Sequence, residues 1–106
     1  MTKKALRALA ETLAQEFGLA LVDTPSPHRM GLRDHTGTLW LSCRKGQTDI
    51  ALGGQSLAQA MTPYMTRLVG RPADGDKSGN GRPYWRVSDV GFIRAAVCQY
   101  TETQRI

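Results

Sequence analysis

Arginine and aromatic residues alternate with apolar residues in short segments whose composition is typical of β-strands. Side chains in a strand point alternately to the two faces of a sheet, so Leu39 and Leu41 on an inner face put Trp40 on the outer face. The same alternation in neighbouring segments adds cations and a second ring. The outer face predicted in this way carries Arg29, Arg33, Trp40, Arg44, Tyr84 and Arg86.

A sheet face that combines aromatic rings with guanidinium groups suits single-stranded nucleic acid. Rings stack on bases at about 1–3 kcal/mol each, and cations follow the phosphates. Further cations in turns and loops extend this candidate interface: Lys45, Arg71, Lys77 and Arg82. The interpretation requires every helix to cover the opposite face and every strand to keep its register, because a one-residue slip exchanges the faces. Otherwise Trp40 belongs to the core and the arginines are ordinary solvated surface.

Two sets of residues raise the question of catalysis. His28, Asp34 and His35, with Asp23, contain the side chains of a metal or nuclease site, and His35 with Cys43 could form a base and nucleophile. Neither set has a diagnostic spacing. We therefore predict a non-enzymatic protein without catalytic residues or cofactors, and a small metal-dependent nuclease remains the enzymatic alternative.

The segment from Asp74 to Gly79 resembles the opening of a calcium-binding loop, with oxygen ligands at alternate positions and glycine sixth. Trp85 stands where that loop needs a bidentate glutamate. We therefore predict no metal site and interpret the Gly-rich stretch of about 70–83 as a flexible loop.

Hydrophobic periodicity indicates the elements that must position the outer face. Apolar residues at helical spacing predict a helix over 4–17. A second helix should begin at a Ser56 cap and end at Gly70, with a kink or a new start at Thr62-Pro63. Ser88 and Asp89 suit the start of a final helix. The predicted strands are 19–23, 29–33, 38–43, 48–52 and 84–87.

The chain therefore predicts one α+β domain spanning 1–106. We expect a small mixed or antiparallel sheet of four to five strands packed against two to three helices. The expected element order is α-β-β-β-β-α-β-α. A domain of this length can bury a core without disulfide bonds.

Composition limits the class of protein. The chain has 106 residues and a formal net charge of +5, which excludes an acidic mimic of DNA. No apolar run reaches the roughly 20 residues of a membrane span, and Glu11 and Glu16 interrupt any signal segment, so we expect a cytoplasmic protein. Cys43 and Cys98 are expected to be buried, reduced thiols.

The order helix, three strands, helix over residues 4–69 is similar to the double-stranded-RNA-binding domain. The segments Ser26-Pro27-His28 and Gly53-Gly54-Gln55-Ser56 resemble its strand-entry and helix-entry loops. That family grips phosphates with a lysine cluster at the start of its second helix. Here those positions are Leu57-Ala58-Gln59-Ala60, so no binding residue is carried over from the family.

Two readings of the partner follow. The first is a nucleic acid, DNA or RNA, or a complex of nucleic acid and protein, bound by the predicted face. The second is a protein target, as for small phage- or plasmid-encoded inhibitors of a host nucleic-acid machine. A homodimer through Tyr64, Met65 or the final helix is compatible with either reading.

Overall fold

The computed structural model describes residues 2–35, 37–76 and 82–104. Its helices and strands follow the predicted order α-β-β-β-β-α-β-α, with one additional two-residue strand before the last long one. The α+β fold is therefore confirmed. The elements are α1 (Lys3–Phe17), β1 (Ala20–Asp23), β2 (Arg29–Arg33), β3 (Thr38–Arg44), β4 (Gln47–Gly53), α2 (Gln55–Val69), β5 (Gly75–Asp76), β6 (Pro83–Val87) and α3 (Val90–Gln104).

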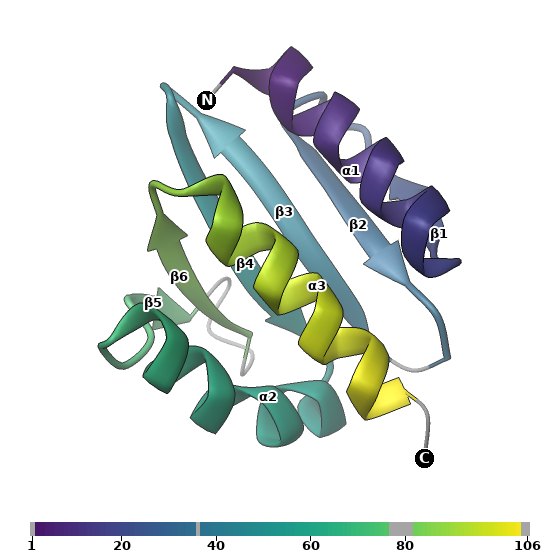
Figure 1. Ribbon diagram of the computed structural model, residues 1–106. Helices are drawn as coiled ribbons and strands as arrows, with labels where there is room; N and C mark the ends of the chain where they lie inside the picture. The colour runs from purple at the N-terminus through teal and green to yellow at the C-terminus, as the bar shows by residue number, and fades with distance from the viewer. Residues whose placement is uncertain (1, 36, 77–81, 105–106) are drawn as a thin grey trace.

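The strands of the described chain form one six-stranded sheet in the order β1-β2-β3-β4-β6-β5, and each neighbouring pair is antiparallel (Figure 1). The first four strands form a meander. The chain then passes through α2 before β6 pairs with β4. The short β5 strand lies within the stretch predicted to be a loop, so residues 70–76 are structured against the sheet edge. Compared with the double-stranded-RNA-binding domain, four strands rather than three lie between α1 and α2.

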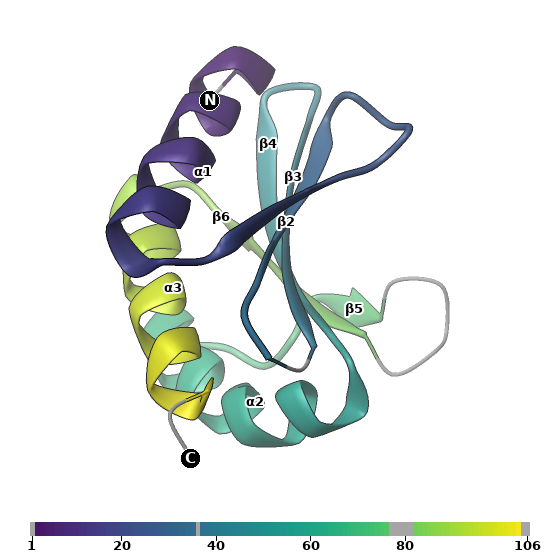
Figure 2. The ribbon, with the colours of Figure 1, turned by 90° about the vertical axis from the view of Figure 1, so that its right-hand side faces the viewer.

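All three helices pack toward the same face of the sheet (Figure 2). The register places Met30, Leu41, Ile50 and Trp85 side by side across four strands, and each of these side chains is fully buried. Leu6 and Leu13 of α1, with other apolar helix residues, pack against these strand residues and complete the core. The main hydrophobic cluster lies on this face, and none of the described helices covers the opposite face.

The helix ends show which capping predictions were right. In α1 the Thr2 hydroxyl accepts a hydrogen bond from the Ala5 amide (3.1 Å), and Gly18 ends the helix at φ 69°. In α2 the capping residue is Gly54, without a side-chain hydrogen bond, so the predicted Ser56 cap is wrong. In α3 the Asp89 carboxylate accepts from the Gly91 amide (2.8 Å), so Asp89 rather than Ser88 is the cap.

α2 is one helix that contains Pro63, so the alternative of two helices with a new start at Thr62 is wrong. Two surface expectations also fail. Met65 is fully buried and is unavailable to a homodimer, and Cys98 is exposed rather than buried. None of the described helices has the length and hydropathy that would let it cross a membrane.

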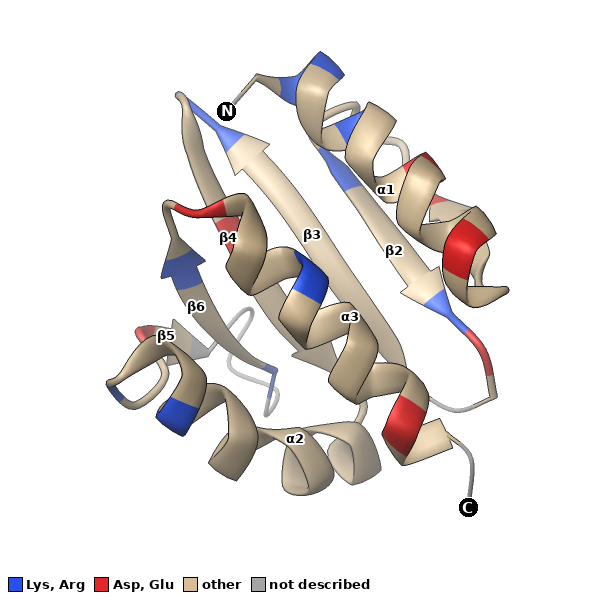
Figure 3. Cartoon of the chain, viewed as in Figure 1, with Lys and Arg blue, Asp and Glu red and all other residues tan. Residues whose placement is uncertain are grey.

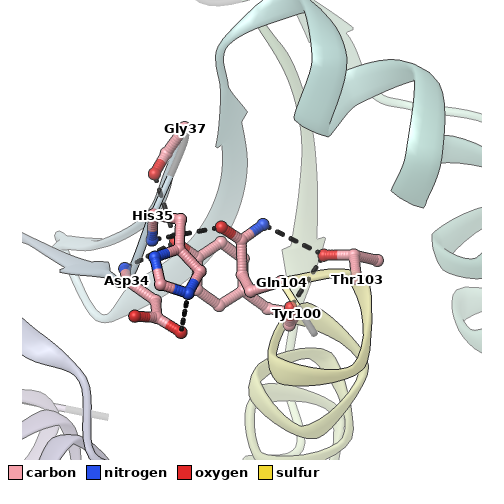
Figure 4. Close-up of polar contacts among 6 residues, drawn as sticks. All are labelled: Asp34, His35, Gly37, Tyr100, Thr103 and Gln104. Carbon is pink, nitrogen blue, oxygen red and sulfur yellow. Dashed lines mark hydrogen bonds and ion pairs between the residues drawn. The ribbon is translucent and has the colours of Figure 1, made fainter. Parts of the chain in front are cut away.

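A buried tyrosine fastens the turn between β2 and β3 to the last helix (Figure 4). The Tyr100 hydroxyl accepts from the Asp34 amide (2.9 Å) and donates to the Gly37 carbonyl (3.1 Å), and Gln104 accepts from the His35 amide (3.2 Å). Burial raises the pKa of Tyr100, because the phenolate would be poorly solvated there. These contacts hold the β2–β3 hairpin in place relative to α3.

Candidate nucleic-acid interface

The strand pairing arranges the helix-free face in rows that run across the sheet. Directly opposed residues share a face, so the register gives a centre row that alternates large and small side chains. This row consists of Val22, Gly31, Trp40, Ala51, Tyr84 and Gly75. The predicted rings of Trp40 and Tyr84 therefore lie on one face, separated by Ala51, with strand spacing placing their Cα atoms about 10 Å apart.

Glycines beneath the rings let both rings lie close to the sheet. A Cβ atom at Gly31 would stand 2.9 Å from Trp40 Cζ3, and one at Gly53 would stand 2.4 Å from Trp40 Nε1. The indole therefore spans β3 from the β2 side to the β4 side. A Cβ atom at Gly75 would likewise stand 2.8 Å from Tyr84 Cε1. Sequence reasoning missed these glycines, although glycine inside a strand is a recognised sign of close approach.

Two guanidinium groups gather at the Trp40 ring. The Arg29 Cζ atom lies 4.4 Å from the ring centroid, and Arg82 Cζ lies 6.0 Å from it. Burial lowers the pKa of Arg29, and the charge of Arg82 lowers it further. The two cations therefore lie close enough to repel each other, and an anion bound between them would relieve that repulsion.

A flanking row on the same face holds further polar groups. It pairs Arg29 with Ser42, Ser42 with Asp49, and Asp49 with Arg86. Arg33 lies on the other side of the centre row, opposite Ala20. Figure 3 shows the resulting distribution, with cations at both ends of β2, at the end of β3 and on β6, and one acidic residue on β4.

The loop between β1 and β2 fixes one of these cations. Arg44 donates to His28 Nε2 (2.8 Å), and His28 Nδ1 lies 2.8 Å from the Ser26 hydroxyl. A guanidinium can only donate, so Nε2 is the acceptor in the contact with Arg44. His28 thus orients the Arg44 side chain.

These groups surround a hollow of about 570 Å³ on the helix-free face, a volume typical of small-ligand pockets. Its wall includes Trp40, and four of the groups that line it are cationic. Those four are Arg29, Arg44, Lys45 and Arg86. Lys45 enters through the tight β3–β4 turn, where Lys45 (φ 53°) and Gly46 (φ 77°) both have positive φ. We call this cavity the Trp40 hollow.

The remaining predicted site residues lie elsewhere. Arg71 donates through Nε and Nη2 to the two carboxylate oxygens of Asp74 (3.0 and 2.9 Å) and through Nη2 to the Arg86 carbonyl (2.6 Å). Asp74 also accepts from the Arg86 amide (2.7 Å), and these bonds lower the pKa of Asp74 to about 2. Arg71 thus holds residues 70–76 against β6. Lys77 lies outside the described residues.

The sets considered for catalysis are not brought together. His28 precedes β2 and His35 follows it, so the two histidines lie at opposite ends of that strand. Asp23 pairs with Arg7 of α1, and Cys43 faces the core. Within the described residues, no three His, Cys, Asp or Glu side chains gather as a metal ion would require. Asp74, the first residue of the calcium-like segment, is engaged by Arg71 and Arg86.

Sequence reasoning did not single out the hollow's polar residues Ser26, Ser42, Gln47 and Asp49. A signal was available for two of them. Ser42 lies between two inward residues of β3, and Asp49 precedes the inward Ile50. The comparisons offer no further guide, because no protein-family model, no curated protein and no solved structure matches this chain.

Proposed function

We propose that this protein binds single-stranded nucleic acid through the helix-free face of its sheet and acts by binding rather than by catalysis. The observation that carries the proposal is the environment of Trp40. Its ring lies low over Gly31 and Gly53, two guanidinium groups approach it, and one wall of the Trp40 hollow is formed by it.

The chemistry of this face matches the two parts of a nucleotide. Aromatic rings and guanidinium planes both stack on bases, and Arg29 lies against the Trp40 ring in a position to extend that stacking surface. The cations in the flanking row suit phosphates, because a guanidinium donates to two phosphate oxygens at once. Asp49 is the acidic residue of that row, across from Arg86, and it limits the positive charge at this point.

Single strands are favoured over duplexes for a geometric reason. In a duplex the bases are stacked on each other and only their edges are accessible, so a ring on a sheet has no base face to contact. In a single strand, bases can leave the stack and lie on Tyr84 and on the surface that Arg29 and Trp40 form together. We therefore propose an unpaired strand, DNA or RNA, as the partner.

Binding should depend steeply on salt. If about four phosphates are neutralised, the slope of log affinity against log salt is about −3, and affinity falls about 50-fold between about 50 and about 200 mM salt. Fluorescence anisotropy of a labelled single-stranded oligonucleotide measures this directly. No binding at low salt, or affinity that does not change with salt, would contradict the proposal.

Arg29→Ala should make that slope less steep by about 0.7, because one phosphate contact is lost. A matched control is Arg67→Ala, which removes the same charge from the exposed surface of α2 on the opposite side of the sheet. The control should keep the wild-type slope. Equal effects of the two variants would mean that net charge alone, and not this face, governs binding.

A further inference from the structure

A second hollow adjoins the proposed interface. Its volume is about 710 Å³, and it lies between the β3–β4 turn, the end of β6 and the start of α3. Both hollows are lined by Lys45, Gln47 and Arg86. Because the same three side chains border both, the two hollows are neighbours at this end of the sheet. We call the second one the Val90 hollow.

The Val90 hollow combines a cationic side with an apolar side. Its charged lining consists of the cations Lys45, Arg71 and Arg86 and the acidic Asp89. Its apolar lining consists of the exposed Val90 and the buried Val87 and Ile93. Val90 is the one large apolar side chain of the described residues that is clearly exposed, at 45%. Arg71 forms an ion pair with Asp74 and lines only the Val90 hollow. Lys45 and Arg86 are the cations that line both hollows.

We infer that a bound single strand continues from the Trp40 hollow past Arg86 and Lys45 and places a further nucleotide in the Val90 hollow. This inference rests on the proposed function and adds the path of the strand to it. Each hollow has the volume of a small-ligand site, which is enough for one nucleotide. The phosphate between the two nucleotides would lie at Arg86 and Lys45, and the apolar side of the Val90 hollow would contact the base.

The first test is the dependence of affinity on strand length. Oligothymidylates of about 2 to about 16 nucleotides cover the usual site size of a small binding domain. Affinity should rise with length beyond the shortest strands that fill the Trp40 hollow, and then level off once the Val90 hollow is also occupied. Contacts with Tyr84 on the sheet face also add affinity with length, so the length series gives the total site size, and the Val90 variants below assign its last part to the Val90 hollow.

Val90→Asp adds the specific test. Val90 is the first residue of α3, and an acidic residue in the first turn of a helix favours the helix, so the variant should remain folded. Its carboxylate would oppose one phosphate contact, so affinity for the longer strands should fall on the order of fivefold at low salt. Affinity for the shortest strands should stay at the wild-type value.

Two controls separate charge from position. Val90→Ser removes the apolar contact without adding charge and should cause a smaller loss, confined to the longer strands. Ser56→Asp adds an acidic residue to the exposed first turn of α2, near the other end of the sheet, and should leave affinity unchanged at every length.

The outcomes distinguish this inference from the proposed function. If wild-type protein binds no oligonucleotide of any length, the proposed function itself fails. If wild-type protein binds, but Val90→Asp has wild-type affinity at every length, the strand does not enter the Val90 hollow and only the inferred path is overturned. An equal loss with Ser56→Asp would also overturn it, because the effect would then be one of net charge.

Discussion

Replacing Trp40 with alanine should lower affinity for single-stranded oligonucleotides about 5- to 150-fold, which corresponds to the loss of about 1–3 kcal/mol of stacking. The slope of log affinity against log salt should stay close to the wild-type value, because the substitution removes a ring and no charge. Arg29→Ala should instead lower affinity and also make the slope less steep, so the salt dependence of the two variants separates the loss of a ring from the loss of a charge.

The variant should fold, because Trp40 is only partly buried and lies on the face opposite the core. Trp40→Phe keeps a ring over Gly31 and Gly53 and should retain most of the affinity. Thermal unfolding of each variant provides the check on folding. Wild-type affinity in folded Trp40→Ala protein would show that the ring takes no part in binding.

Fluorescence gives an independent readout of the same contact. The chain has two tryptophans, and Trp85 is fully buried in the core, so a base stacked on the face should quench only Trp40. Addition of oligonucleotide should therefore quench the wild-type emission and leave the emission of Trp40→Phe unchanged. Quenching that persists in Trp40→Phe would place the contact at Trp85 or attribute it to a change in the core.

Trp85→Ala should be the most destabilising of the substitutions considered. Trp85 is fully buried beside Ile50, and its removal leaves a cavity that costs about 3–5 kcal/mol. A domain of this size has about 5–15 kcal/mol of stability in total. The expected fall in Tm is more than about 12 °C, measured by circular dichroism.

Trp85→Phe tests a second role of the same side chain. The indole Nε1 donates to the Arg71 carbonyl (3.1 Å), and this bond holds the start of the 70–76 segment to β6. Phenylalanine fills most of the volume but cannot donate. Hydrogen exchange should therefore become faster at the Asp74 and Arg86 amides, which bond within this segment, while amides in β3 stay protected. Unchanged exchange at Asp74 would show that Arg71 and Asp74 hold the segment without the indole.

The outer face of β3 could be predicted because apolar residues of the same strand identify its inner face. Leu39, Leu41 and Cys43 are apolar at alternate positions, so the orientation of Trp40 follows from period-two alternation alone. The absence of a helix over that face could not be derived in the same way. It depends on where α1, α2 and α3 pack, and each helix could satisfy its apolar stripe on either side of a sheet.

The position of Arg82 shows that local sequence patterns do not reveal which residues a side chain will contact. In the sequence Arg82 ends a Gly-rich stretch and has no expected neighbour. In the structure β6 pairs with β4, which is the neighbour of the β3 strand that carries Trp40, and this pairing brings Arg82 to the Trp40 ring. Long-range pairing of this kind is set by the tertiary fold, so sequence analysis could include the residue as a cation but could not place it.

The errors at helix ends and on surfaces have similar causes. Ser56 has the side chain of a cap, but α2 begins at Gln55, so Gly54 occupies the capping position, where a Cβ atom would lie 3.2 Å from Gly37 Cα. Met65 and Cys98 are single residues whose exposure depends on which neighbouring helix packs against them. The Met65 side chain of α2 packs in the core, whereas Cys98 of α3 is exposed.

The glycines beneath the two rings also constrain which substitutions evolution can accept. A side chain at position 53 would collide with the indole of Trp40, and a side chain at position 75 would collide with the ring of Tyr84. A relative that keeps an aromatic residue at 40 or 84 therefore has to keep the glycine that lies beneath that ring. A relative that has lost the ring is released from the requirement, so 40 and 53 should covary, as should 84 and 75.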